Sequence, residues 1–363
     1  MAKLGDFISP AKNIKCGDGK YPVLSMTMHD GIVLQSDRFK KSLASADQSG
    51  YKVVDYGQLV VGFPIDEGVL YLQRVIEQGI MSPAYNVWDV DYSHVDPSYF
   101  ELSLHSPQAM QYYKENLRGS TARRRSLPKE VLLELPLKMP SMDEQKRVAT
   151  SIDKLTHLID MRSKQLDKLD ELVKSRFIEM FGDPVLNPKG WLLKRFDSIC
   201  ENLDSQRIPI ASAERKVGPY PYYGASGIVD YVENYIFDED LLLISEDGAN
   251  LVMRSTPIAF SISGKTWVNN HAHVVRFEHL STQKYIEMCF ELRDISDSIT
   301  GSAQPKFNQA KLNEILFPLP PLDLQNQFAD FVAQVDKSKL VAQRGAVGRF
   351  FHKRDSLHRI YLQ

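Results

Sequence analysis

The stretch PLPPLDLQNQFADFV at residues 318–332 repeats, in altered form, an earlier stretch, PLKMPSMDEQKRVATSI at residues 136–152. The two copies are separated by about half the length of this chain of 363 residues. A shift of 180 residues carries Pro140 onto Pro320, and it also matches Asp143 with Asp323, Gln145 with Gln325, Ala149 with Ala329 and Ile152 with Val332. The repeat predicts a tandem duplication with two similar halves.

The first copy opens a long predicted helix. Ser141 and Glu144 have the spacing of a capping box, in which each side chain satisfies a free amide at a helix start. Apolar residues then follow at alternating intervals of three and four, which places them on one stripe of a helix: Ile152, Leu155, Ile159, Leu166, Leu169, Val173 and Met180. Gly182 and Pro184 end the pattern. A helix of about 40 residues is roughly 60 Å long and needs a partner for its stripe.

The second copy opens a similar helix. No proline occurs between Asp323 and Gln363, and a weaker apolar stripe is formed by Phe328, Val332, Val335, Ala342, Ala346 and Phe350. Gly345 and Gly348 lower the helix propensity here by about 1 kcal/mol each. Two similarly patterned helices predict an antiparallel two-helix coiled coil that separates two globular parts. The alternative is two unrelated amphipathic helices, each belonging to its own domain.

The two globular parts, residues 1–135 and 183–317, have the same order of patterns. Each reads as strand, turn, strand, in DYGQLVVGF (55–63) and SPAYNVWDV (82–90), and again in DEDLLLISE (238–246) and NHAHVVRFE (270–278). A helical stretch follows in each part, at 98–117 and 281–299, and then a polar loop, at 118–126 and 300–308. We therefore expect an α+β fold built as a pseudo-twofold tandem repeat of globule and helix.

Composition limits the class of protein. The chain has 44 basic and 46 acidic residues, a net charge of −2, which argues mildly against a nucleic-acid binder that works alone. Its three cysteines lie too far apart in sequence to indicate a disulfide framework or a close-spaced metal site. No apolar run approaches the roughly 18 residues of a membrane helix, and no signal peptide is evident at the start. We expect a cytoplasmic location.

No fragment makes a convincing active site. SGKTW (263–267) ends like a phosphate-binding loop, but Ala259 stands where that motif needs glycine, and the preceding run reads as a strand. DPSY (96–99) lacks the second proline of an adenine-methyltransferase signature and reads as a turn before a helix. His271 and His273 would lie on one face of a strand, but no histidine or cysteine cluster completes a metal site. We therefore expect no catalytic residue and no metal.

Two polar segments favour contact with DNA. Arg123, Arg124 and Arg125 lie in a loop before the first long helix, where arginine could pair with guanine or phosphate, although a surface charge run is the simpler interpretation. Lys265, Asn269, Asn270 and His271 are expected on a turn between two strands. Asparagine pairs well with adenine edges but is also common in turns.

Taken in order, these segments resemble the DNA-specificity (S) subunit of a type I restriction–modification system over nearly the whole chain. The second half carries the most specific pieces, YPYYGASGIVDYVENYIFDEDLLLISEDGANL (220–251), GKTWVNNHAHVV (264–275) and GSAQPKFN (301–308), together with the repeated stretch at 318–332. The first half carries SGYKVVDYGQLVVGFP (49–64), GIMSPAYNVW (79–88) and EQKRVATSID (144–153).

The resemblance implies two target-recognition domains, at 1–137 and 183–318, and two spacer helices, at 138–182 and 319–363. Each domain would read half of a split target in double-stranded DNA. The helices would dock two methyltransferase subunits, which carry S-adenosylmethionine and methylate adenine N6. Endonuclease subunits would use ATP and magnesium.

Within this scheme Gln304 and Lys306 join the predicted DNA-binding residues of the second domain. Gln145, Ile152, Gln325 and Phe328 are expected to contact the partner subunits. The chain itself would hold no cofactor and would be a non-catalytic subunit. The alternative is a coiled-coil scaffold or dimerising protein with no role on DNA.

Overall fold

The computed structural model describes residues 2–28, 30–38, 47–118, 127–301 and 304–343. The chain divides into two compact units, and the boundary falls between Arg162 and Ser163, inside the long helix α5 (Met142–Phe181). No helix in the described ranges is long and apolar enough to span a membrane.

The first unit is built on a four-stranded antiparallel sheet with the order β2–β9–β6–β7. Its strands are β2 (Ile8–Pro10), β6 (Leu59–Val61), β7 (Leu70–Leu72) and β9 (Asn86–Val90). Leu59, Leu70 and Trp88 are buried against helices that follow the sheet in sequence. Those helices are α2 (Pro97–Leu104), α3 (Pro107–Asn116) and α4 (Lys129–Leu133).

Smaller pieces complete this unit. The two-stranded sheets pair β1 (Ala2–Lys3) with β10 (Pro136–Leu137), β3 (Leu24–Met26) with β4 (Ile32–Leu34), and β5 (Lys52–Asp55) with β8 (Gln78–Met81). A short helix, α1 (Gln35–Arg38), follows β4. Asp96 caps α2, because its side chain accepts the N–H of Tyr99 at 3.0 Å. The DPSY segment is therefore a helix start, as the sequence indicated.

The second unit contains a sheet of the same order, β12–β19–β16–β17. Its strands are β12 (Glu201–Asn202), β16 (Leu241–Ser245), β17 (Ala259–Ile262) and β19 (Ala272–Arg276). In both sheets every neighbouring pair is antiparallel. The predicted strand, turn, strand patterns form the central pairs, β6 with β9 and β16 with β19. The shared strand order confirms the predicted duplication at the level of the fold.

The second unit differs from the first by an added sheet with the order β14–β13–β18–β15. Its strands are β13 (Val217–Gly224), β14 (Gly227–Val232), β15 (Phe237–Asp238) and β18 (Lys265–Val268). Helix α7 (Leu280–Leu292) packs on β17, and α8 (Gln309–Glu314) follows the polar loop at 300–308. The short helix α6 is Asn250–Met253, and β11 (Leu192–Arg195) pairs with β20 (Leu316–Leu319).

The repeated stretch forms the joint between each globule and its long helix. Gln145 Nε2 donates to the carbonyl of Pro140 at 2.9 Å, and Gln325 Nε2 donates to the carbonyl of Pro320 at 2.7 Å. A buried tyrosine completes each joint. The Tyr99 hydroxyl donates a hydrogen bond to the Lys138 carbonyl at 2.8 Å, and the Tyr285 hydroxyl donates one to the Pro318 carbonyl at 2.6 Å. Burial raises the pKa of Tyr99 to about 12, so it remains a donor at neutral pH. The same four-part joint is thus made twice.

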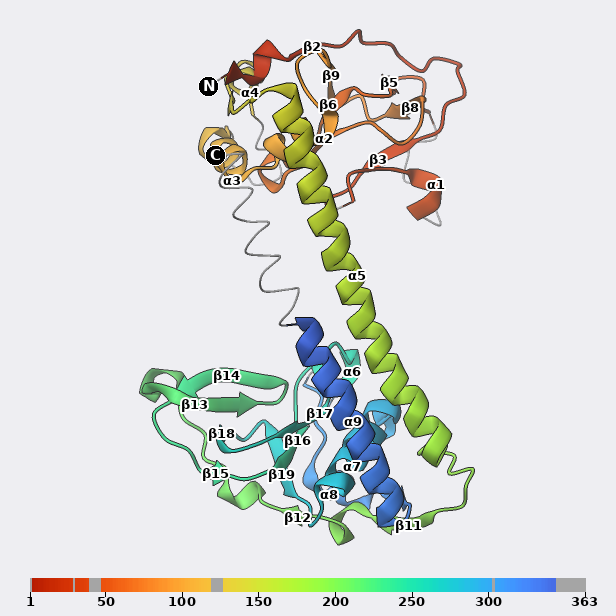
Figure 1. The fold of residues 1–363 in the computed structure, drawn as a ribbon, viewed down its shortest axis with the longest axis vertical. Helices are drawn as coiled ribbons and strands as arrows, with labels where there is room; N and C mark the ends of the chain where they lie inside the picture. The colour runs from red at the N-terminus through yellow and green to blue at the C-terminus, as the bar shows by residue number, and fades with distance from the viewer. Residues whose placement is uncertain (1, 29, 39–46, 119–126, 302–303, 344–363) are drawn as a thin grey trace. The chain divides into compact units, whose positions relative to one another are not determined.

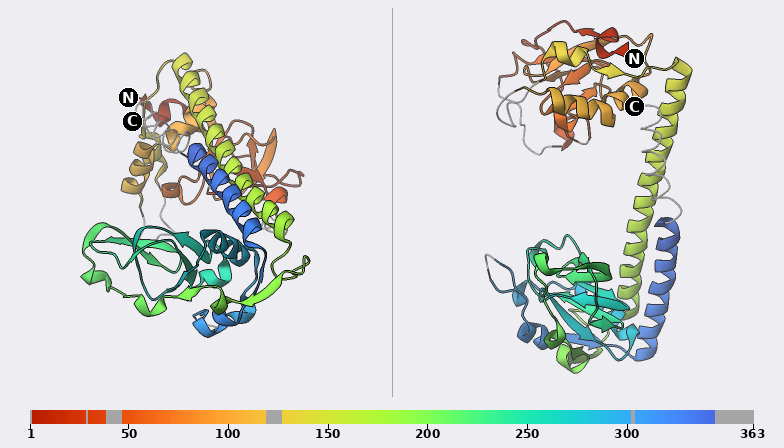
Figure 2. Two further views of the ribbon diagram at one scale, coloured as in Figure 1. Left: turned by 60° about the horizontal axis from the view of Figure 1, so that its bottom comes forward. Right: turned by 90° about the vertical axis from the view of Figure 1, so that its left-hand side faces the viewer.

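Within the second unit, α9 (Leu322–Ala342) packs antiparallel to the C-terminal half of α5. Lys339 pairs with Asp170 at 2.5 Å, whereas the ring of Phe328 lies 5.4 Å from that of Phe177, so the two helices run in opposite directions. The helices lie side by side in Figure 1 and in both views of Figure 2. This is the predicted antiparallel helix pair, described as far as residue 343; residues 344–363, with Ala346 and Phe350 of the second stripe, lie outside the described ranges.

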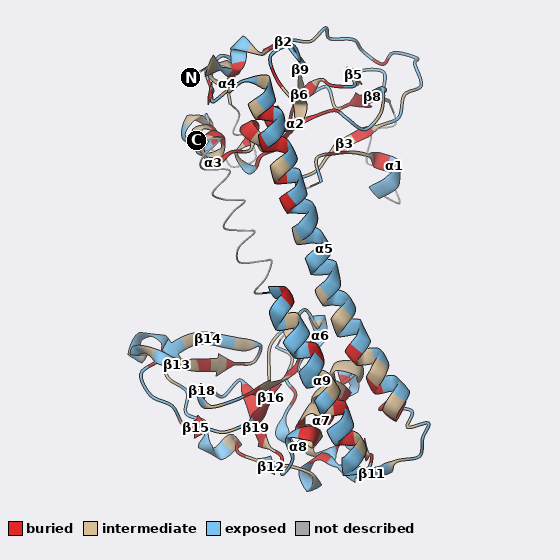
Figure 3. Cartoon of the chain, in the orientation of Figure 1, coloured by how far each residue is buried: buried red, intermediate tan, exposed pale blue. Residues whose placement is uncertain are grey.

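All seven residues of the first predicted stripe are buried or half-buried, whereas α5 is largely exposed around its middle (Figure 3). The stripe missed Phe177 and Phe181, which are almost completely buried. Together with Phe328 and Tyr285 they form an aromatic cluster with ring centroids 4.9–5.6 Å apart. Gly182 ends α5 with a φ of +80°, a conformation that favours glycine.

Candidate nucleic-acid interface

The turn between β18 and β19 presents two polar side chains on the surface of the second globule. Asn269 is buried, and its Oδ1 accepts the N–H of His271 at 2.8 Å, which fixes the turn. Asn270 and His271 are exposed, and the His271 ring is anchored to the carboxylate of Asp247 at 2.9 Å. Asn269 therefore supports the turn, and Asn270 and His271 are the members that a ligand can reach.

The polar loop at 300–308 lies beside this turn. The Phe307 N–H donates to the Glu246 carbonyl at 2.8 Å, the Gly248 N–H donates to the Pro305 carbonyl at 3.1 Å, and Lys306 forms an isolated bridge with Asp247. Gln304 and Lys306 are exposed. Asp247 thus brings the loop and the turn together, and Asn270, His271, Gln304 and Lys306 form one polar edge. We call these four residues the second polar edge.

Lys265 belongs elsewhere, and its expected place on the turn is wrong. It is the first residue of β18, whereas Asn269 directly follows the strand's last residue, about 13 Å from Lys265 at the usual rise per residue. Its ammonium lies 4.8 Å from the ring centroid of Tyr235 and 6.0 Å from that of Tyr220. SGKTW is therefore a turn that follows β17 and the start of β18, with no helix to form a phosphate-binding loop.

The three arginines predicted to contact DNA in the first globule, Arg123, Arg124 and Arg125, lie outside the described residues. In sequence order, the loop at 118–126 corresponds to the loop at 300–308 of the second unit. Each loop precedes a short helix, α4 or α8, and that helix is followed by a short strand, β10 or β20.

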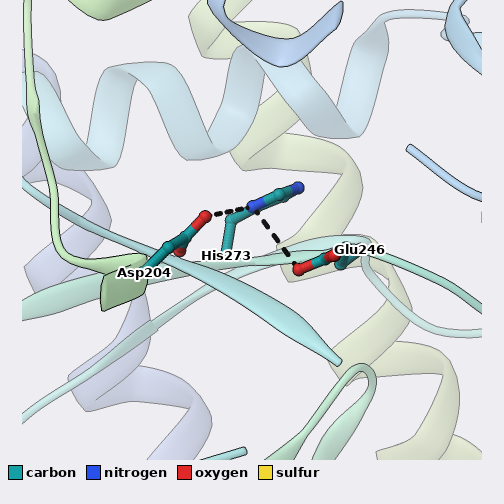
Figure 4. Close-up of side chains that lie close together, drawn as sticks. All are labelled: Asp204, Glu246 and His273. Carbon is teal, nitrogen blue, oxygen red and sulfur yellow. Dashed lines mark hydrogen bonds and ion pairs between the residues drawn. The ribbon is translucent and has the colours of Figure 1, made fainter. Parts of the chain in front are cut away.

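An ion network lies directly beneath the second polar edge. Figure 4 shows His273 between Asp204 and Glu246, which come from three separate segments of the chain. His273 Nδ1 lies 2.6 Å from Asp204 and 3.7 Å from Glu246, and its Nε2 lies 2.8 Å from the Phe307 carbonyl. Arg207 completes the network by donating to Glu246 at 2.6 Å and to the Ala272 carbonyl at 2.7 Å.

The geometry defines the charge of this network. Both ring nitrogens of His273 face oxygen atoms that accept, so a ring that makes both bonds is an imidazolium cation. Burial works to raise the pKa of Asp204, but hydrogen bonds from His273 and the Val274 N–H, with the nearby positive charges, hold that pKa below its usual value. Two cations and two carboxylates therefore neutralise each other. Such a network is chemically suited to fixing positions.

Asp204, Glu246 and His273 form a group close enough for metal ligation, with ligand atoms within 4.8 Å of one another. Their partners do not suit a metal. The Phe307 carbonyl engages Nε2 of His273, and the Arg207 guanidinium supplies the positive charge that the two carboxylates require. A metal would have to displace Arg207. Ala272 and His273 directly follow His271, and Phe307 directly follows Lys306, so the network positions the second polar edge.

Comparison with known proteins agrees with this architecture. Residues 188–346 match the family model described as the type I restriction modification DNA specificity domain. A putative type I restriction enzyme specificity subunit of Haemophilus influenzae is 33% identical over 134 residues, which cover 37% of this chain and 34% of the relative. The match thus spans about a third of that relative's length. The resemblance to the specificity subunits of type I restriction–modification systems is confirmed.

Longer matches cover both halves. A type I restriction enzyme specificity subunit of Methanocaldococcus jannaschii is 22% identical over 380 residues, covering 93% of this chain and 85% of the relative. The crystal structure of a type I restriction–modification S subunit from M. genitalium has a TM-score of 0.59 at 14% identity, and covers 98% of this chain and 94% of that one. At this identity the likeness shows that the specificity-subunit fold is shared.

The four residues expected to contact partner subunits lie inside the chain. Gln145, Ile152, Gln325 and Phe328 are 1%, 2%, 3% and 0% exposed. The glutamines close the globule–helix joints, and Phe328 fills the aromatic cluster. Ile152 packs with Tyr99, Val148 and Ala149. Side chains this deeply buried have no surface for direct contact with a partner. They instead attach the helices to their own globules.

Sequence reasoning also missed residues that the fold brings together. Asp204 starts a short 3₁₀ helix (Asp204–Gln206), Glu246 directly follows β16, and His273 lies in β19, so no local motif joins them. The lone sequence signal was the pair His271 and His273, whose spacing places them on one face of a strand. In the structure the first binds Asp247 and the second binds Asp204.

Proposed function

We propose that this chain is the DNA-reading subunit of a type I restriction–modification complex, and that each globule reads one half of a bipartite target. The observation that carries the proposal is the duplicated unit, in which the same sheet order and the same globule–helix joint occur twice. A target in two halves requires two DNA-binding globules that share one fold and differ in their loops. We propose that the chain acts in the cytoplasm, on the DNA that the complex reads.

The chemistry of the second polar edge supports this assignment. Asparagine and glutamine amides pair with adenine edges, and lysine pairs with guanine or with phosphate. Asn270, Gln304 and Lys306 are exposed and belong to segments that backbone bonds hold together. We propose that these residues, with His271, contact DNA through the second globule. Arg123, Arg124 and Arg125 remain proposed contacts of the first.

Partner subunits would supply the chemistry. We propose that two methyltransferase subunits, which carry S-adenosylmethionine, dock against the helices, and that endonuclease subunits using ATP and magnesium join them. Since the four residues first expected at this interface are buried, docking would use apolar side chains exposed on the helix surfaces. Those on α5 are Leu158, Met161, Leu172 and Ile178, and those on α9 are Leu322, Leu340 and Val341.

The test is single-molecule methylome sequencing of a host that lacks adenine methylation and expresses this chain with a type I methyltransferase partner. The expected result is N6-methyladenine in a split motif that requires both proteins. The control expresses the partner alone. The purified chain by itself should neither methylate nor cleave DNA.

The alternative, a coiled-coil scaffold with no role on DNA, predicts a stable complex with the partner and no new methylated motif. That outcome would overturn the proposed function. A motif that is continuous and not split would contradict the assignment of one half-site to each globule.

A further inference from the structure

A basic pocket lies at the edge of the main sheet of the first globule, where β2 ends and β5 begins. The polar residues of its wall are three lysines and two asparagines: Lys12, Asn13, Lys52, Asn86 and Lys129. The remaining wall residues are apolar or contribute backbone, and none is acidic. Three ammonium groups therefore share a concave site that contains no carboxylate.

The lysines lack internal counter-ions. Within the described ranges none of Lys12, Lys52 and Lys129 forms an ion pair, and Lys52 donates to the carbonyl of Tyr85 at 2.5 Å. Burial lowers the pKa of Lys52, and the nearby charge of Lys129 lowers it further. Positive charges that repel one another at close range favour a bound anion.

The pocket also offers neutral donors. Asn13 and Asn86 are the amide-bearing residues that line it. An anion with several oxygen atoms can accept from ammonium and amide donors at the same time.

The second globule shows what stands at the matching position. In the first globule, Pro10 pairs with Trp88, and the N–H of the next residue, Ala11, donates to the carbonyl of Val87. In the second globule, Asn202 pairs with Val275, and the N–H of the next residue, Leu203, donates to the carbonyl of Val274. This register matches Lys12 with Asp204 and Asn86 with His273. The second globule therefore places its neutral ion network where the first places uncompensated lysines.

We infer that Lys12, Lys52 and Lys129 of the first globule bind a phosphate group of the DNA backbone. The inference rests on the proposed function. It assigns a backbone contact, which positions the globule without reading sequence. Duplex DNA is favoured because Lys129, which lines the pocket at the start of α4, comes four residues after Arg125 in sequence, close to a segment that the proposed function already assigns to DNA.

The test compares variants of the full chain in complex with its methyltransferase partner. Lys12→Gln with Lys129→Gln removes the two exposed lysines and leaves half-buried Lys52 in place to protect folding; a triple variant adds Lys52→Gln. Lys20→Gln with Lys114→Gln is the matched control, because it removes the same charge from exposed positions of this globule outside the pocket. Binding to a duplex that contains the methylated motif is measured by fluorescence anisotropy over a range of salt concentrations.

We expect the double variant to bind roughly tenfold more weakly at low salt, or about 1.4 kcal/mol. The slope of log affinity against log salt should fall by about 0.9, the value for one phosphate contact. The methylated motif should stay the same, since a backbone contact carries no sequence information. The control variant should keep the wild-type slope.

A wild-type slope in both the double and the triple variant, with the motif still read and methylated, would overturn this inference and leave the proposed function standing. A wild-type complex that reads no motif would overturn both. If calorimetry showed that the variants lose saturable binding of inorganic phosphate while duplex affinity is unchanged, the pocket would be a small-anion site and the backbone assignment would fail.

Discussion

Replacing Asp204 with asparagine should show how strongly the ion network holds the second polar edge. The substitution keeps the size of the side chain and removes one of two carboxylates. The two carboxylate oxygens of Asp204 separately accept from His273 Nδ1 at 2.6 Å and the Val274 N–H at 2.8 Å, and the amide of the variant has only one oxygen for both and no negative charge. His273 keeps Glu246 at 3.7 Å, and its Nε2 still bonds the Phe307 carbonyl. A buried cation is left with half of its compensation.

The expected loss of stability is about 3 kcal/mol. Removing one partner of a buried ion pair costs about 3–5 kcal/mol, whereas a surface pair contributes about 0–1 kcal/mol. The buried value applies because the side chains of His273 and Asp204 are 1% and 9% exposed. The lower end of the range applies because Glu246 remains. A loss of this size corresponds to roughly a hundredfold change in an equilibrium constant.

The effect should depend on pH in a defined direction. The pKa of Asp204 lies below its usual value in the folded protein, so its stabilising contribution is complete above the unfolded pKa, near 4. The contribution is lost as pH falls through the folded value. Asp204→Asn cannot titrate there, so the stability difference between wild type and variant should shrink below about pH 4.

Hydrogen exchange read by mass spectrometry provides the assay, because it resolves the second globule from the first. Peptides that cover Leu203, Ser245 and Val274 should exchange up to about a hundredfold faster in the variant at neutral pH. Asp197→Asn is the control, since it breaks an exposed pair with Arg195 in the same globule and should leave exchange near wild type. Unchanged protection of the Val274 amide, which donates to Asp204 at 2.8 Å, would refute this account of the network.

Three further predictions concern the helices and the globules. Phe177→Ala should destabilise the second unit by about 3–5 kcal/mol in denaturant unfolding, because it empties the centre of the aromatic cluster, whereas Ile178→Ala, at a 41% exposed position, should cost much less. Gln325→Leu should cost about 1–3 kcal/mol in the same assay by leaving the buried Pro320 carbonyl without its donor, and exposed Gln327→Leu is the control. Exchanging residues 183–318 for the matching segment of a relative should change one half of the methylated motif, and a change in both halves would show that the globules do not read independently.

The long helices were predictable because their signals are local. A capping serine, an apolar stripe and a terminal glycine all act within a few turns. The structure keeps one arm of the predicted capping box: Ser141 Oγ accepts the Glu144 N–H at 3.4 Å, but the Glu144 carboxylate pairs with Arg147 at 2.6 Å. The alternating three–four spacing of apolar residues did not include Phe177 and Phe181. These two residues lie on a second face of α5, which Tyr285 of α7 covers.

The candidate site was less predictable because its parts meet through tertiary structure. The turn at 269–271 could be found as a run of polar residues between strands. Its support could not, since Asp204 and Glu246 reach His273 from distant segments with no shared motif. The repeated glutamines gave a strong sequence signal whose meaning was misjudged: side chains of one type at matching places suggested a shared partner, and the structure uses them to close the same joint twice.

The two sheet edges suggest why a change of specificity should require a whole globule. The turn at 269–271 enters β19, and His273 on that strand needs Asp204, Glu246 and Arg207 around it. At the matching position the first globule has Lys12, so a transplanted His273 would meet an ammonium where it now meets a carboxylate. The graft would bring an ammonium close to the imidazole and leave the imidazole without its carboxylate acceptor. Moving residues 183–318 together keeps every member of the network with its partners, so the exchanged half-site should be read on a folded globule, whereas the loop graft should unfold the edge that carries it.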